Sequence, residues 1–268
     1  MKLEWIIVSV VLSLSSTANA LQGGELLVDT SVKRAIIEPT MVQQAIDLEK
    51  QIAAQANMDA PEGKSTVVIL KGNRNIIITA PHATEPFRAG KYRFSDGAGT
   101  AALADMLNKL SCATVIYTQY RTPSDPNYYD DNEFKNKLAE LINTHKPALV
   151  LDIHGSHDSR PYDIDFGTMN GKALLTNPSL LTSLMANLRQ ENIVNFSDNY
   201  FAAEKNQTIT RFAYTRGVPA IQLEISSTLL RPSEGGMMAH RFAQLLQSLT
   251  RYVRDVTSNP SGECDPTF

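Results

Sequence analysis

Three short apolar runs in this sequence each lead into a side chain that can bind a metal ion or carry a proton. The runs are residues 76–80, 150–153 and 220–223, and they lead to His82, His154 and Glu224. In open α/β sheets, ligands bind in the crevice beyond the carboxyl ends of the strands. If the runs are neighbouring strands, these three side chains meet at one edge of a sheet.

The first group is His82-Ala83-Thr84-Glu85. Catalytic zinc sites use three protein ligands of the nitrogen or oxygen type and keep one position open. His82, Glu85 and a more distant histidine would provide such a set. The alternative is that His82 and Glu85 are a capping pair on a surface loop.

The second group is Asp152-Ile153-His154-Gly155-Ser156-His157. Residues two apart in a strand point to the same face, so Asp152 and His154 point together. We predict that His154 is the distant metal ligand. Asp152 either orients this imidazole or caps a neighbouring turn, since a buried carboxylate needs a partner. His157 is an alternative ligand, a substrate-facing residue or simply a loop residue.

The third group is Gln222-Leu223-Glu224-Ile225, in which a carboxylate interrupts an apolar strand. Glu224 is expected to act as a general base that takes a proton from the attacking water and later delivers it to a leaving amine. The alternative is a buried ion pair with an arginine such as Arg211.

The elements that position these residues alternate between helices and strands. Apolar periodicity predicts helices over residues 40–57, 96–110, 130–145, 179–190 and 234–253, and strands over 66–70, 75–79, 113–118, 148–153, 162–167 and 218–225. The first two strands are separated by four residues and are expected to form a hairpin. We therefore predict an α/β fold with a mixed, mostly parallel sheet and helices on both faces.

Residues 1–20 resemble a cleavable secretory signal, because Lys2 precedes an apolar run, Trp5 to Leu14, and small residues then lead to Ala18-Asn19-Ala20. The alternative is a buried N-terminal element. Cleavage predicts an exported protein, periplasmic or extracellular, with one domain over residues 21–268, a core at about 65–256 and no further membrane segment. The net charge of −3 and the absence of a Lys/Arg block argue against a nucleic-acid partner.

The two cysteines, Cys112 and Cys264, do not form a C-x-x-C pair, so a cysteine-based metal site is not supported. In an oxidising compartment they could form a disulfide that holds the C-terminal tail. The alternative is two separate thiols.

Taken in order, Thr79-Ala80-Pro81-His82, Asp152-Ile153-His154 and the stretches 162–167 and 218–225 resemble the N-formylglutamate amidohydrolase family. This family belongs to the zinc carboxypeptidase and aspartoacylase group, and the resemblance covers residues 76–231. It implies a zinc-carboxypeptidase-like, three-layer (phosphorylase/hydrolase-like) architecture. It also implies one zinc ion held by His82, Glu85 and His154, with Glu224 as the catalytic carboxylate.

The segment 120–128 carries the family's substrate contacts. By resemblance, Arg121 helps to stabilise the oxyanion, while Asp125 and Asn127 help to hold the substrate. Tyr128 stands where the family has an arginine, and a phenol cannot replace a bidentate guanidinium. The missing charge must then come from elsewhere, and the candidate residues are Arg88, Arg93, Arg160 and Arg211.

These observations predict a zinc-dependent hydrolase that cleaves the amide bond of an N-acyl (N-formyl) amino acid or a related small substrate. An exported peptidase acting on short or cell-wall peptides is the alternative within this class. A binding protein that keeps the scaffold without catalysis is the alternative from another class.

Overall fold

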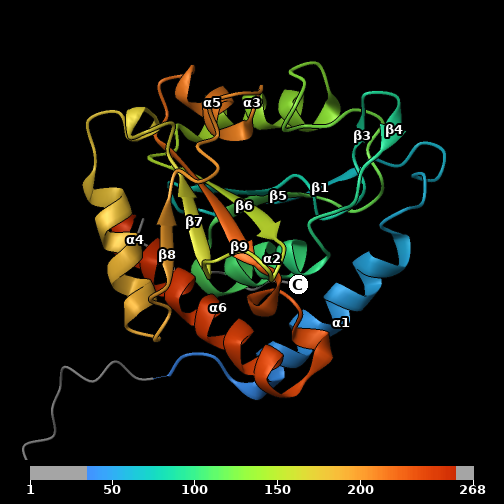
Figure 1. The fold of residues 1–268 in the computed structure, drawn as a ribbon. Helices are drawn as coiled ribbons and strands as arrows, with labels where there is room; N and C mark the ends of the chain where they lie inside the picture. Colours follow the sequence, from blue (N-terminus) through green and yellow to red (C-terminus); the bar gives the residue numbers. More distant parts are fainter. Residues whose placement is uncertain (1–34, 258–268) are drawn as a thin grey trace, which may run out of the picture. The chain divides into compact units, whose positions relative to one another are not determined.

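The computed structural model describes residues 35–257 (Figure 1). The predicted signal, residues 1–20, and Cys264 lie outside the described residues. Export and the disulfide between Cys112 and Cys264 therefore stay predictions.

A seven-stranded sheet forms the middle layer, in the order β1-β5-β2-β6-β9-β7-β8. Its strands are β1 (Val67–Leu70), β2 (Ile77–Ala80), β5 (Thr114–Thr118), β6 (Val150–Ser156), β7 (Ile164–Gly167), β8 (Phe196–Asp198) and β9 (Ala220–Ser226). β1 is antiparallel to β5 and β7 is antiparallel to β9, whereas the other neighbours are parallel. The predicted mixed, mostly parallel sheet is confirmed.

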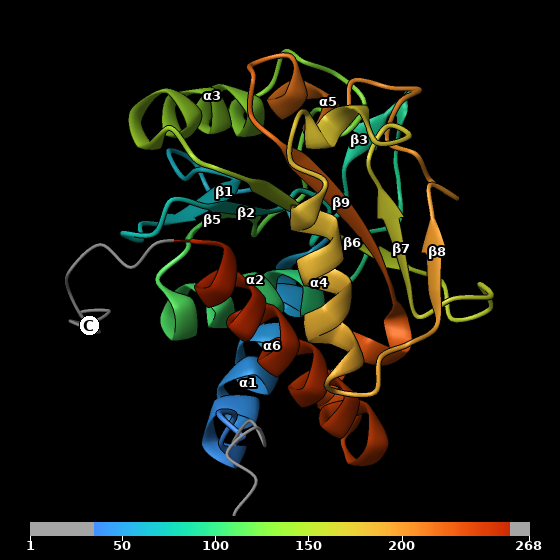
Figure 2. The same cartoon turned by 90° about the vertical axis from the view of Figure 1, so that its left-hand side faces the viewer.

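Helices cover both faces of this sheet, as predicted. They are α1 (Pro39–Gln55), α2 (Gly99–Ser111), α3 (Glu133–His145), α4 (Ser179–Arg189), α5 (Ile209–Tyr214) and α6 (Gly236–Val256). Figures 1 and 2 show α3 and α5 on one face and α1, α2, α4 and α6 on the other. Within the described part of the chain, no helix is both long and apolar enough to cross a membrane.

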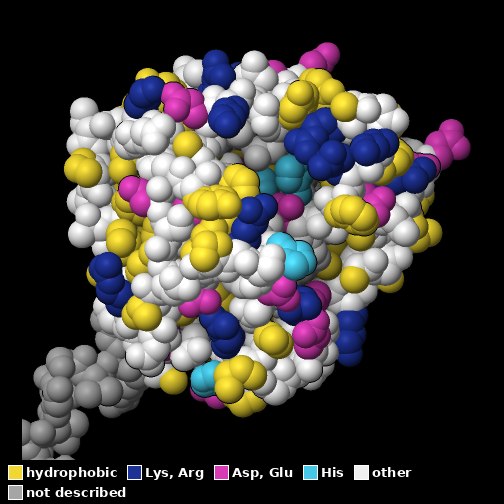
Figure 3. Space-filling view, viewed as in Figure 1, with side chains coloured by type: hydrophobic (Ala, Val, Ile, Leu, Met, Phe, Trp, Pro, Cys, Tyr) yellow, Lys and Arg dark blue, Asp and Glu magenta, His cyan; other side chains and the backbone are white. Residues whose placement is uncertain are grey.

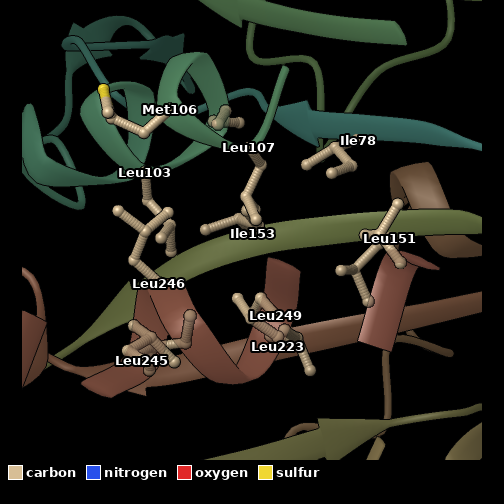
Figure 4. Close-up of a cluster of buried hydrophobic side chains, with 14 of the residues drawn as sticks. Ile78, Leu103, Met106, Leu107, Leu151, Ile153, Leu223, Leu245, Leu246 and Leu249 are labelled. Atoms are coloured by element: carbon tan, nitrogen blue, oxygen red, sulfur yellow. The ribbon is translucent and has the colours of Figure 1, made fainter. Parts of the chain in front are cut away.

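Alternation along the central strands sends side chains to two separate cores. Ile78, Leu151 and Leu223 pack with α2 and α6 in the larger core (Figure 4). The alternate residues along the same strands, such as Ile77 and Val150, point to the opposite face and pack with α3 and α5 in the smaller core. Because residues two apart share a face, Thr79, Asp152, His154, Gln222 and Glu224 are carried on the α3/α5 side. Burial of each large aliphatic side chain stabilises this arrangement by about 1.5–3 kcal/mol.

The predicted hairpin between residues 66–70 and 75–79 is wrong, because β5 lies between β1 and β2 and pairs with both. β5 is buried along its whole length, so pairing on both sides satisfies its backbone away from water. The segment that connects β1 to β2 is also hydrogen-bonded to residues at the start of β5. Gly72 N–H donates to Thr114 Oγ1 at 3.0 Å, and Arg74 N–H donates to the Cys112 carbonyl at 3.1 Å.

Other differences concern short elements and the bounds of predicted ones; β6 runs to Ser156, so His154 lies within the strand and not after it. The two-stranded ribbon of β3 (Phe87–Arg88) and β4 (Lys91–Tyr92) was not predicted, nor were β8 and α5. α3 begins at Glu133 because Asn132 caps it, accepting a hydrogen bond from Lys135 N–H. α2 begins at Gly99, which leaves Asp96 in the loop before it.

Candidate active site

His82, Asp96 and His154 form a group that could hold a metal ion. One potential ligand atom from each lies within 4.8 Å of the others. Asp96 Oδ2 is 2.7 Å from His154 Nδ1 and 3.5 Å from His82 Nδ1. His82 follows β2 and His154 lies on β6, the neighbouring parallel strand, so the structure brings these two predicted ligands together.

The other ring nitrogen of each histidine is held by a buried carboxylate. His82 Nε2 lies 2.7 Å from Asp125 Oδ1, and His154 Nε2 lies 3.1 Å from Asp152 Oδ2. Asp152 in turn accepts a 2.6 Å hydrogen bond from Thr79 Oγ1. Carboxylates in this position fix the tautomer and orientation of metal-binding imidazoles. Both Nδ1 atoms are therefore turned toward Asp96.

The group is electrostatically prepared for a cation. Burial alone would lower the pKa of His82, but Asp96 and Asp125 raise it to about 9. Burial likewise opposes protonation of His154, yet Asp152 and Asp96 raise its pKa well above the usual value. Burial opposes ionisation of Asp96, but the two histidines hold its pKa well below its usual range. Three carboxylates around two imidazoles therefore favour bound positive charge.

The donor set fits a metal ion of the zinc type. It combines two imidazole nitrogens with one carboxylate oxygen, and each imidazole has its own hydrogen-bonding carboxylate. Three ligands of this kind, with room for a further one, are typical of catalytic zinc sites.

Asp96 was missed by the sequence reasoning. Its N–H donates to the His82 carbonyl at 2.8 Å, which folds the loop before α2 back over the end of β2. Gly155 allows this loop to approach β6, because a Cβ there would lie 3.2 Å from Asp96 Cβ and overlap the Asp96 carbonyl oxygen. In sequence, Asp96 is the first residue of the predicted helix 96–110, and nothing in its spacing marks it as a ligand.

Glu85, the third predicted ligand, is not part of this group. Its main chain is engaged elsewhere. Its N–H donates to the Ala56 carbonyl at 3.0 Å, and its carbonyl accepts from Thr122 N–H at 2.9 Å. The geometry favours Asp96 over Glu85 as the third ligand.

Glu224 lies on β9 directly opposite His154 in the parallel pairing. Burial raises its pKa to about 7, with His154 opposing and Asp96 adding to the shift. Gln222 Nε2 donates to Glu224 Oε1 at 2.9 Å. Arg211, the alternative partner, points elsewhere and donates to the Glu204 carbonyl at 3.4 Å. Such a carboxyl group can exchange a proton near neutral pH.

The remaining predicted substrate residues have different places. Arg121 forms a two-pronged ion pair with Asp59, with both N···O distances at 2.5 Å, and its guanidinium stacks on Tyr92 at 4.3 Å. The structure does not bring Arg121 to the metal-competent group. Asp125 orients His82, as described above, and is 1% exposed.

Asn127 joins two segments near the site. Its N–H donates to Asp125 Oδ1, and its own Oδ1 accepts from Ile209 N–H at the start of α5, both at 2.8 Å. Asn127 also lines the cavity described below. It thus borders the region where it was predicted to hold the substrate.

Arg88, on β3, lies beside Tyr128, the residue that stands at the family's arginine position. Its guanidinium lies 5.0 Å from the centre of the Tyr128 ring, and its Nη1 lies 3.4 Å from Asp125 Oδ2. It also lines the cavity, which Arg93, Arg160 and Arg211 do not. The aromatic ring therefore supports a guanidinium that comes from a different segment of the chain.

A cavity of about 630 Å³ extends from Glu224 and Arg88. The space-filling view in Figure 3 shows a hollow on this face, with a histidine inside it and Lys/Arg and hydrophobic side chains around it. Residues 199–206 line one side, and we call this segment the wall. The three metal-competent residues do not line the cavity themselves. Arg88 contacts the carboxylate that orients His82, and Glu224 is paired with His154, so the group lies at its inner end.

No protein-family model and no curated protein sequence matches the chain significantly. Solved structures with a similar fold include N-formylglutamate amidohydrolase from Ralstonia eutropha JMP134 (14% identity, TM-score 0.47, covering 72% of this chain and 99% of that chain). Bacteriophage poly-gamma-glutamate hydrolase is similar at 17% identity and TM-score 0.47, covering 72% of this chain and 92% of that chain. A metallo-carboxypeptidase from Pseudomonas aeruginosa is similar at 13% identity and TM-score 0.44, covering 80% and 68%. The similarity of the chain to these hydrolases is one of fold.

Proposed function

We propose that this protein is a zinc-dependent hydrolase that cleaves an amide bond in an N-acyl amino acid or a related small substrate. The observation that carries the proposal is that a group able to hold a metal ion and a carboxyl group able to exchange a proton lie side by side on neighbouring strands. His82, Asp96 and His154 converge on one point, and Glu224 stands beside them with a pKa of about 7.

His82, Asp96 and His154 would hold the ion, through the two Nδ1 atoms and a carboxylate oxygen. A zinc ion bound there would act as a Lewis acid toward a carbonyl group and toward water. Asp125 and Asp152 keep the imidazoles in the tautomer that leaves Nδ1 available.

Glu224 acts as the general base and then as the general acid. With a pKa of about 7, its carboxylate can accept a proton from the attacking water and return it to the leaving amine. Gln222 Nε2 donates a hydrogen bond to Glu224 Oε1, which fixes the carboxylate and leaves Oε2 to exchange the proton.

Arg88 binds the carboxylate of the substrate. It lines the cavity that Glu224 also lines, and the Tyr128 ring beneath it restricts its guanidinium. A planar guanidinium matches a carboxylate by two parallel hydrogen bonds. Arg88 thus supplies the positive charge for the substrate carboxylate, which Tyr128 cannot provide.

The test compares the wild type with Glu224→Gln and His154→Ala, using metal quantification and a panel of N-formyl and N-acetyl amino acids. We expect one zinc per wild-type chain and turnover of at least one amide. Glu224→Gln should keep zinc and lose at least about 100-fold in kcat, the upper part of the range for general acid–base groups being about 10⁴-fold. His154→Ala should lose both zinc and activity.

Full activity in zinc-loaded Glu224→Gln would refute the mechanism. A wild type that holds no stoichiometric zinc, and whose melting temperature does not respond to a chelator, would instead support a binding protein without catalysis.

A further inference from the structure

The backbone of the wall, residues 199–206, is held by buried hydrogen bonds. Asp165 is fully buried on β7, and its two carboxylate oxygens accept from Tyr200 N–H at 2.9 Å and Phe201 N–H at 2.7 Å. Within residues 35–257 Asp165 forms no ion pair with a basic side chain, so these amides are its main compensation for burial. Because the buried carboxylate depends on these two N–H groups, it fixes the backbone at Tyr200 and Phe201.

A second set of contacts holds the first residue and the middle of the wall. Asn199 Oδ1 accepts hydrogen bonds from Thr168 N–H, Thr168 Oγ1 and Asn170 N–H at 2.9–3.2 Å. Thr208 Oγ1 donates to the Ala203 carbonyl at 2.7 Å. The wall is thus connected to the end of β7 and to the start of α5.

Gly167 lets the wall lie directly against β7. A Cβ at this position would overlap the Phe201 carbonyl oxygen and would lie 3.1 Å from Gln222 Cβ. Gln222 is the residue that holds Glu224, so the wall packs against the strand pair that carries the general base.

The two aromatic side chains of this fixed segment are nevertheless exposed. Tyr200 is 53% exposed and Phe201 is 36% exposed, although their ring centres are only 5.0 Å apart. Arg160 stacks on both rings, at 5.5 and 5.1 Å, and donates to Tyr200 Oη at 3.0 Å. Rigid aromatic side chains at the edge of a cavity offer apolar area at little cost in conformational entropy, as in preorganised binding surfaces.

The charges and size of the cavity indicate what these rings would bind. Arg88 and Lys205 line it, whereas the acidic Glu204 is paired with Lys172 at 2.6 Å. A cavity of about 630 Å³ falls in the range of sites that enclose drug-sized ligands, which are much larger than an N-formyl amino acid. The lining therefore suits a longer chain with carboxylate, amide and apolar groups.

We propose that the wall is a second subsite, which binds an apolar side chain of the substrate beyond the scissile amide, and that the substrate is a peptide of several residues. This inference rests on the proposed function and names the substrate class of the same site.

The experiment measures binding without turnover. Zinc-loaded Glu224→Gln protein is titrated by calorimetry with a single N-acyl amino acid and with acyl peptides of two to four residues, carrying either Leu or Gly at the distal position. We expect the longer Leu peptides to bind roughly tenfold more tightly than the Gly peptides, because binding against the two rings removes the apolar area of the Leu side chain from water. Adding Tyr200→Ala or Phe201→Ala should remove most of this ratio.

Met237→Ala is the matched control, because Met237 is an apolar residue that is 67% exposed on α6 and does not line the cavity. It should leave the Leu/Gly ratio unchanged. An affinity that does not depend on peptide length, or a ratio that survives both wall variants, overturns the inference. If the ratio behaves as expected but the wild type hydrolyses none of these peptides, the proposed function fails while the subsite stands.

Discussion

Gly155→Ala is expected to damage the metal site from a position that contributes no side chain to it. In the structure, the Asp96 backbone passes so close to Gly155 that an added Cβ would overlap the Asp96 carbonyl oxygen and press on Asp96 Cβ at 3.2 Å. β6 is fixed between β2 and β9, so the loop that carries Asp96 must give way.

The size of the displacement follows from contact distances. To restore an ordinary separation of about 3.5 Å, the Asp96 carbonyl must retreat by roughly 1 Å. Metal–ligand distances tolerate only about 0.2 Å. Asp96 Oδ2, now 2.7 Å from His154 Nδ1, would then leave the group. We expect zinc affinity to fall by at least about 10- to 100-fold, the loss typical when even an outer partner is disturbed.

The assay is competition for zinc with a chromogenic chelator, together with thermal unfolding of the zinc-free proteins. Gly72→Ala is the matched control, since its Cβ would overlap the Cys112 carbonyl oxygen in the link between β1 and β2. Both variants should lose about 1–3 kcal/mol of stability through overpacking, but Gly72→Ala should bind zinc normally. Asp96→Ala should reproduce the affinity loss without the steric clash. Unchanged zinc affinity in folded Gly155→Ala and in Asp96→Ala would refute the role of Asp96.

Two further changes separate orientation of the site from stability of the fold. Asp125→Asn keeps an oxygen near His82 Nε2 but removes the charge, so zinc affinity should fall by about 10- to 100-fold in the same competition assay; an unchanged affinity would mean that Asp125 does not orient His82. Although burial opposes ionisation of Glu133, hydrogen bonds from Ser65 and Thr66 lower its pKa. A lowered folded-state pKa stabilises the fold above the unfolded value of about 4.3, and this is lost as pH falls through the folded value. Glu133→Gln should therefore lower the melting temperature at pH 7, with a gap that closes in acid; a gap independent of pH would contradict this account.

Sequence alone was sufficient for the strand-end groups, because apolar runs that end in His154 or Glu224 combine a strong local pattern with the general behaviour of parallel sheets. The same local patterns could not predict which strands are neighbours in the sheet. β1 and β2 are close in sequence, but the buried strand β5 separates them, and this depends on contacts made by residues much later in the chain.

The proposed third metal ligand, Asp96, and the proposed substrate arginine, Arg88, show the same limit. Asp96 reaches the site through a loop that folds back onto His82 and Gly155, a backbone geometry that residue spacing does not encode. Arg88 and Arg121 are equally suitable in chemistry, and tertiary packing alone places one beside Asp125 and the other beside Asp59.

The order of these residues along the chain divides the site into two portions that can change independently. The residues that could hold the ion, and the carboxylates that orient them, all come from the chain up to His154. The wall is a single excursion between β8 and α5, attached through Asp165, Asn199 and Gly167. If the wall is the proposed subsite, replacing the exposed residues of this excursion while keeping its three anchors should change substrate preference without rebuilding the residues that could hold the ion.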